Sequence, residues 1–149
     1  MGDYTYHALS SIEGVKTTKP ESTFYLLADF NEFSSVLQEA KITTSQKLSE
    51  ALIVHPYHTA IVGGDSLVLE RNDFSARIAF VDYNGAQVFD EYLENKPKTT
   101  SDKIEFVKNN APKIVSGIKM IEKFFNDLKQ QTLPTLQTRS TGMITTKLP

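Results

Sequence analysis

The stretch Thr23-Phe24-Tyr25-Leu26-Leu27-Ala28-Asp29-Phe30 decides the fold class. Aromatic and aliphatic residues dominate it, and its apolar side chains fall on both alternating faces of an extended backbone. This pattern predicts a central strand, with strands on both sides and helices over at least one face.

Three shorter segments supply the neighbouring strands. Residues 15–18 alternate weakly before Pro20, as an edge strand does. Residues 59–62 form an apolar run that ends at Gly63-Gly64, and residues 76–81 alternate apolar side chains with Arg77. These segments predict a small sheet.

Helical periodicity covers most of the remaining chain. The segments that show it are residues 4–12, 31–40, a helix capped by Thr44 or Ser45, a helix capped by Asp82 or Asn84, and a long final helix. The final helix has apolar residues at every third or fourth position: Ile104, Val107, Ala111, Ile114, Ile118, Ile121, Phe125 and Leu128. We expect Pro112 to kink or restart this helix.

The order helix, strand, helices, two strands, helices predicts an α+β fold. Its sheet is small, mixed or antiparallel, and covered by helices in a sandwich that ends with a long amphipathic helix. We expect residues 1–14 to connect to another domain, residues 15–130 to form the domain itself, and residues 131–149 to be an extended or poorly ordered tail, rich in threonine.

Composition and charge exclude several classes of protein. The chain has 149 residues, 16 basic and 18 acidic side chains, a net charge of −2 and no cysteine. A nucleic-acid-binding domain needs a basic face, so we expect no nucleic-acid partner. Apolar stretches are far shorter than the ~20 residues of a spanning helix, and the N-terminus lacks the features of a secretory signal, so we expect no membrane partner.

Two clusters superficially suggest chemistry. His55 and His58 have a spacing that can share a helix face, but Pro56 between them breaks a helix, and ordinary surface histidines are the better interpretation. Gly63-Gly64-Asp65-Ser66 follows a strand as phosphate loops do, but it lacks a Walker lysine, so a tight turn is favoured. A triad of Ser66, His58 and Asp65 has no strand–elbow–helix context.

Arg77 is the one candidate for a binding residue. It interrupts an apolar strand, so its guanidinium either faces solvent or enters a site that needs a planar, permanently charged clamp for an anion. Periodicity alone leaves both interpretations open.

Three motifs in order resemble the small domain of pyridoxal-phosphate-dependent aminotransferases of class I/II. Pro20-Glu21-Ser22-Thr23-Phe24-Tyr25-Leu26 resembles the family's Pro-x-Gly-x-Phe-Tyr-Leu, and Ala60-Ile61-Val62-Gly63-Gly64-Asp65-Ser66-Leu67 lies where the family has valines and Pro-Gly-Ser-x-Phe. Ala76-Arg77-Ile78-Ala79-Phe80 is similar to the family's Tyr-Ile-Arg-Leu-Ser-Phe strand. The chain departs from the family at Ser22, at Gly63, and in a longer segment over residues 82–111.

The resemblance implies that Arg77 binds the α-carboxylate of an amino-acid or 2-oxo-acid substrate. It also implies that pyridoxal 5'-phosphate is held by a large domain that precedes this one, and that the protein is a cytoplasmic homodimer. The chain has no cofactor-binding lysine motif, so we expect it to be inactive alone. On this interpretation an apolar surface for the large domain is exposed, with Tyr4, Tyr6 and Leu9 as its candidates.

Two alternatives remain at this stage. The chain could be a freestanding α+β ligand-binding or regulatory module, whose helical stripe and two-faced strand would look much the same. It could also be an aminotransferase-like interaction protein without catalytic activity.

Overall fold

Strand β2 (Tyr25–Asp29) lies inside a four-stranded antiparallel sheet of order β1-β2-β4-β3. The computed structural model describes the backbone of residues 1–141 and the side chains of residues 1–131. Its other elements are α1 (Gly2–Ser10), β1 (Lys16–Thr17), η1 (Asn31–Phe33), α2 (Ser34–Glu39), α3 (Ser45–Ile53), β3 (Val62–Gly63), η2 (Gly64–Leu67), β4 (Ser75–Ala79), α4 (Gly85–Asn95), α5 (Thr100–Asn110) and α6 (Pro112–Thr141). The predicted α+β class is confirmed.

The sheet is built around the long pairing of β2 with β4. Five residue pairs join these strands, from Tyr25 opposite Ala79 to Asp29 opposite Ser75. Strand β3 adds to the other edge of β4, with Val62 opposite Arg77, and β1 adds to the other edge of β2. Arg77 therefore has a strand on each side.

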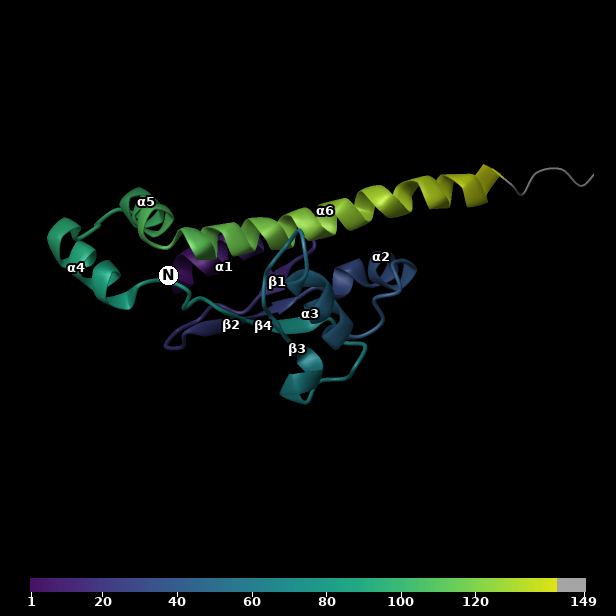
Figure 1. Ribbon diagram of the computed structural model, residues 1–149, viewed down its shortest axis with the longest axis horizontal. Helices are drawn as coiled ribbons and strands as arrows, with labels where there is room; N and C mark the ends of the chain where they lie inside the picture. Colours follow the sequence, from purple (N-terminus) through teal and green to yellow (C-terminus); the bar gives the residue numbers. More distant parts are fainter. Residues whose placement is uncertain (142–149) are drawn as a thin grey trace, which may run out of the picture.

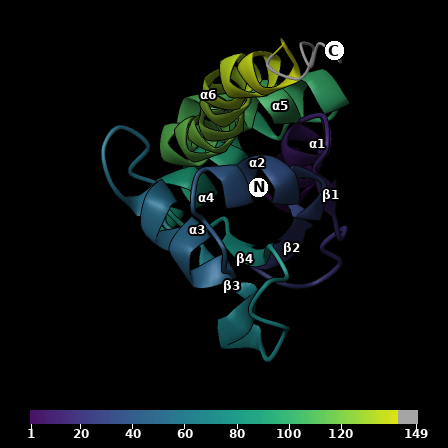
Figure 2. The ribbon, with the colours of Figure 1, turned by 90° about the vertical axis from the view of Figure 1, so that its right-hand side faces the viewer.

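Helices α1 and α6 run along one side of the sheet, and Figure 2 shows the same layers end-on (Figures 1 and 2). The core fills the space between them. It includes Leu26, Ala28, Ala76 and Ile78 from the sheet, and Ile114, Ile118, Ile121, Phe124, Phe125 and Leu128 from α6. Phe125 stacks on Phe33 with ring centroids 4.1 Å apart, which ties α6 to the start of α2.

The apolar stripe predicted for the last helix is split between two helices. Helix α5 ends at Asn110 and α6 begins at Pro112, so the restart expected at Pro112 is confirmed. Proline suits a first helical position because its missing N–H has no intrahelical partner there. Helix α5 starts at Thr100 because Thr99 and Asp102 form a capping box.

Other boundaries differ from expectation. Strand β3 spans Val62–Gly63 instead of residues 59–62, because Thr59 donates its backbone N–H to the Leu52 carbonyl at the end of α3. Helix α6 continues to Thr141, through residues expected to be extended, and adding turns to an existing helix costs little. The expectation for residues 142–149 lies outside the described residues.

Helix α1 belongs to the core more than the sequence indicates. Leu9 is fully buried, so its assignment to an exposed apolar surface is wrong, while Tyr4 and Tyr6 are partly buried against the core. The cause is that α1 packs on α6 and on β2. After α1, Gly14 adopts φ +88°, and a Cβ there would lie 2.9 Å from the Phe33 ring.

Within the described residues, no helix combines the length and the apolar character that crossing a membrane requires.

Candidate functional site

Arg77 lies at the middle of β4, on the face of the sheet away from α1 and α6. Its neighbours along the strand, Ala76 and Ile78, are buried in the core, and side chains alternate between the two faces of a strand. Arg77 is itself half-buried. Leu27 of β2 and Val62 of β3 stand opposite it on its two sides.

The guanidinium of Arg77 contacts an aromatic ring. Its Cζ atom lies 5.3 Å from the centroid of the Tyr25 ring, within cation–π distance. Among the described side chains, residues 1–131, no ion pair includes Arg77. Its charge is therefore not neutralised by an acid in this part of the chain.

An acidic diagonal neighbour of Arg77 is bound elsewhere. Asp29 lies two pairs along β2 from Leu27, so it is a diagonal neighbour of Arg77 on the same face. Its Oδ1 accepts hydrogen bonds from the backbone N–H and from the Nδ2 amide of Asn31, both at 2.8 Å. Asn31 thus holds the carboxylate that could otherwise pair with Arg77.

A second carboxylate joins this network. Asn31 Nδ2 also donates to Asp73 Oδ1 at 2.9 Å, and the Ser75 backbone N–H donates to the same oxygen at 2.9 Å. Hydrogen bonds from Ser75 and Asn31 hold the pKa of Asp73 below its ordinary value. The ionised form of Asp73 is thus stabilised at the start of β4.

Apolar side chains flank Arg77 on both neighbouring strands. Leu27 of β2 and Val62 of β3 stand opposite it, and Leu27 is 37% exposed. A planar cation with five N–H donors can hold a carboxylate through two parallel hydrogen bonds. An apolar rim strengthens such a pair because it displaces water from one side of it.

The glycine pair at the end of β3 packs closely against neighbouring backbone. A Cβ at Gly63 would lie 2.8 Å from the Ser45 backbone, and one at Gly64 would lie 2.9 Å from the Ser75 carbonyl oxygen. Ser45 Oγ donates to Asp65 Oδ1 at 2.9 Å and accepts from the Asp65 backbone N–H at 3.0 Å. These contacts fasten the loop to the start of α3, in keeping with the tight turn that the sequence favours.

The histidine cluster does not assemble into a metal site. The rings of His55 and His58 lie edge to face, 5.6 Å apart. In the part of the chain that the structure describes, no three histidine, cysteine or acidic side chains are grouped to hold a metal. Asp65 is bound to Ser45, and Ser66 is exposed in η2.

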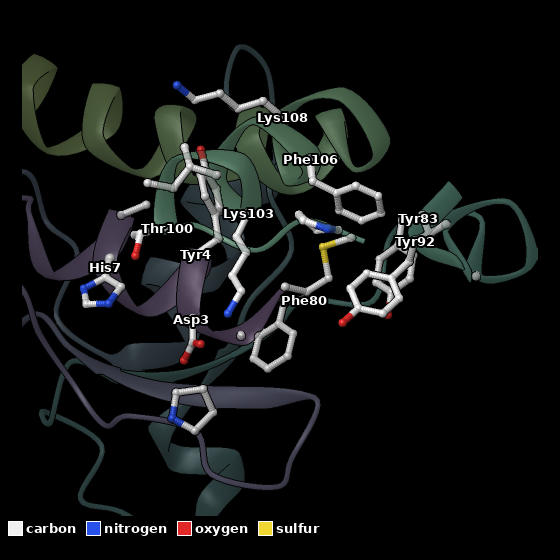
Figure 3. A pocket seen from close by; sticks show the side chains of 18 of the residues that line it. Asp3, Tyr4, His7, Phe80, Tyr83, Tyr92, Thr100, Lys103, Phe106 and Lys108 are labelled. Carbon is white, nitrogen blue, oxygen red and sulfur yellow. The ribbon is translucent and has the colours of Figure 1, made fainter. Parts of the chain in front are cut away.

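A cavity of about 1100 Å³ opens between α1, the end of β4, α4 and α5 (Figure 3). Its walls carry aromatic rings from α1, α4, α5 and the segment after β4: Tyr4, Phe80, Tyr83, Phe89, Tyr92 and Phe106. The side chain of Lys103 extends from α5 toward Asp3 and Phe80. Helix α4 has no buried residue, and its Val88, Phe89 and Tyr92 line this cavity.

Sequence reasoning missed the partners of Arg77. The alternation of β2 identifies Tyr25, Leu27 and Asp29 as sharing one face, but only the pairing register brings this face against Arg77. It also missed the cavity, because the residues of β4 and α4 do not show how these two elements are placed relative to each other.

Comparison with known proteins adds no assignment, since no protein-family model and no curated protein matches the chain.

Proposed function

We propose that the chain is the C-terminal small domain of a pyridoxal-phosphate-dependent aminotransferase, and that Arg77 binds the α-carboxylate of the substrate. The observation that carries the proposal is the state of Arg77: its guanidinium stands on the open face of a central strand with no ion pair among residues 1–131. An arginine in an apolar strand is costly to desolvate unless it has an anionic partner. A substrate carboxylate would supply that partner.

The sheet supports this assignment beyond the motif itself. The strand with the Phe-Tyr-Leu motif and the strand with the arginine pair directly, so Tyr25, Leu27 and Arg77 share one face. Bidentate pairing fixes both the position and the plane of a carboxylate, which a lysine ammonium cannot do. Arg77 would thus orient an amino acid or a 2-oxo acid for reaction.

The cofactor would belong to another domain. Among residues 1–131, the buried polar side chains are Thr5 and Ser45, so no lysine in this part is buried. A lysine that forms a Schiff base is activated by desolvation or by a neighbouring charge. We therefore assign no step of the reaction to a lysine here; pyridoxal 5'-phosphate, which stabilises carbanions when bound, would be held by the large domain.

The wider proposal follows from the same family. The domain would close over the active site formed with the large domain, in a cytoplasmic homodimer that converts amino acids and 2-oxo acids. On its own the chain would bind substrate carboxylates without transamination.

The cavity favours a second candidate, a freestanding ligand-binding module. Its volume, about 1100 Å³, suits a ligand of drug size or larger, and its walls combine aromatic rings with charged side chains such as Asp3 and Lys103. This candidate gives no role to Arg77, which lies on the other face of the sheet and has no ion pair among residues 1–131, and we therefore rank it second.

The coding sequence immediately upstream of this chain separates the two candidates. The aminotransferase proposal expects an in-frame stretch that encodes a cofactor-binding domain with its Schiff-base lysine. An untranslated region at this place would contradict the proposal and favour the module.

A further inference from the structure

Tyr25 and Arg77 are placed together by the register of β2 and β4. Leu27 lies opposite Arg77 and Tyr25 lies opposite Ala79, so Tyr25 is a diagonal neighbour of Arg77 on the same face. Diagonal neighbours in an antiparallel pair are within reach when one side chain is aromatic and the other is long. The 5.3 Å separation between Cζ and the ring centroid meets this expectation.

Arg77 has a second diagonal neighbour with the opposite chemistry. Asp29 lies on the other side of Leu27 along β2, and it could take the guanidinium in an ion pair. Its Oδ1 is instead held by two hydrogen bonds from Asn31. The guanidinium lies over the aromatic neighbour rather than beside the acidic one.

The choice of neighbour decides whether the donors of Arg77 stay available. A carboxylate partner uses the in-plane N–H groups of a guanidinium, which are the groups that a substrate carboxylate needs. A ring partner attracts the cation through its π-face and requires no N–H donor. Contact with Tyr25 therefore restrains Arg77 and leaves its hydrogen-bonding edge free.

We propose that Tyr25 is the positioning residue for Arg77: its ring holds the guanidinium over β2 with its N–H donors directed to an incoming carboxylate. The inference rests on the proposed function of Arg77. An arginine side chain loses much rotamer freedom when it binds an anion, and a side chain restrained beforehand loses less. Tyr25 thereby increases the affinity for a carboxylate that it need not touch.

Nitrogen-15 NMR of the chain tests the restraint directly. The chain has three arginines, Arg71, Arg77 and Arg139, so an Arg77→Lys variant identifies the Arg77 Nε–H signal. Tyr25→Leu removes the ring, Tyr25→Phe keeps it, and Tyr92→Leu removes an exposed tyrosine of α4 as a matched control. We expect a lower order parameter and a shifted Nε–H signal in Tyr25→Leu alone.

Titration with acetate measures the consequence. We expect acetate to shift the Arg77 Nε–H signal, and Tyr25→Leu to weaken its binding by about two- to fivefold, the range that a cation–π contact at an exposed site supports. Tyr25→Phe should restore the affinity because it keeps the ring.

The two measurements separate the inference from the function beneath it. An unchanged Arg77 order parameter in Tyr25→Leu overturns the role of Tyr25, whatever acetate does. A lowered order parameter without an acetate response in any variant supports the role of Tyr25 and contradicts the carboxylate site. If Tyr25→Leu does not fold, cross-relaxation between the Tyr25 ring and the Arg77 Hδ protons in the unchanged chain decides, and its absence overturns the inference.

Discussion

The Nδ2 amide of Asn31 donates a hydrogen bond to Oδ1 of Asp29 at 2.8 Å, and the backbone N–H of Asn31 donates a second to the same oxygen. The same side chain accepts a hydrogen bond from the Phe74 backbone N–H through its Oδ1, at 2.9 Å. Asn31 thus joins the end of β2 to the start of β4. It also binds the carboxylate of Asp29, the acidic diagonal neighbour of Arg77.

Replacing Asn31 tests both roles. Asn31→Ala leaves the partly buried N–H of Phe74 without its side-chain acceptor, and we expect the free energy of unfolding to fall by about 1–3 kcal/mol. The variant also loses the Nδ2 donor to Asp29 and keeps only the backbone N–H on Oδ1. Asp29 then competes better for Arg77, so acetate should bind more weakly to the variant than to wild type. Urea unfolding and the acetate titration measure the two effects. Asn95→Ala, at an exposed position on α4, serves as the control and should change neither.

The pKa of Tyr57 should lie well above the ordinary value of a tyrosine. Its hydroxyl donates to Asp127 Oδ2 at 2.8 Å, and burial, with this carboxylate, raises its pKa to about 12. Because the folded pKa exceeds the unfolded value near 10, the stability from this group is complete below about pH 10 and is lost as pH rises through 12. Absorbance titration should show a tyrosine step near pH 12 that Tyr57→Phe removes. A wild-type curve without that step would contradict the prediction.

The capping box of α5 should stabilise the start of this helix, which lines the cavity. Thr99 Oγ accepts from the Asp102 N–H at 3.1 Å, and the Asp102 carboxylate accepts from the Thr99 N–H at 3.0 Å, which lowers the pKa of Asp102. We expect Thr99→Ala to destabilise the start of α5 by about 1 kcal/mol. Amide exchange in α5 measures the change, and equal protection in both chains would contradict it. The stabilisation that comes from the ionised Asp102 carboxylate is present above the ordinary pKa of an aspartate. It is lost as pH falls through the lowered pKa of Asp102.

The chain should form no lasting Schiff base with pyridoxal phosphate. Its lysines among residues 1–131 are not buried, so none has the desolvated amine that this chemistry favours. After mixing and dialysis, we expect no stoichiometric absorbance band from an imine. A stable band at one lysine would show that the chain holds the cofactor itself and would overturn the assignment of the cofactor to another domain.

The sequence predicted the features that depend on residues close together in the chain: strand alternation, helix caps and the restart at a proline. Alternation at Ile78 and Arg77 predicts which side of β4 is buried, and the side-chain oxygens of Thr44 and Asn84 accept the capping bonds expected at α3 and α4. Pro112 restarts the last helix where its missing N–H permits.

The features that the sequence did not predict depend on contacts between residues far apart in the chain. Strand β3 begins at Val62 because the backbone N–H of Thr59 is bonded to the end of α3, a contact that no local pattern predicts. The position of Tyr25 near Arg77 depends on register across 52 residues of chain, and the burial of Leu9 depends on α6. Candidate residues were thus predictable one at a time, while their arrangement was not.

The preference for an amino acid over its decarboxylated amine tests the central claim most directly. It is measured as kcat/KM for the two substrates in the protein that joins this domain to its cofactor domain, for wild type and Arg77→Gln. Two charge-assisted hydrogen bonds predict that the variant loses at least about 100-fold in kcat/KM for the amino acid. The value for the amine, which has no carboxylate, should change only a few-fold. An equal loss for both substrates, or no loss for either, would contradict the assignment of Arg77 to the carboxylate.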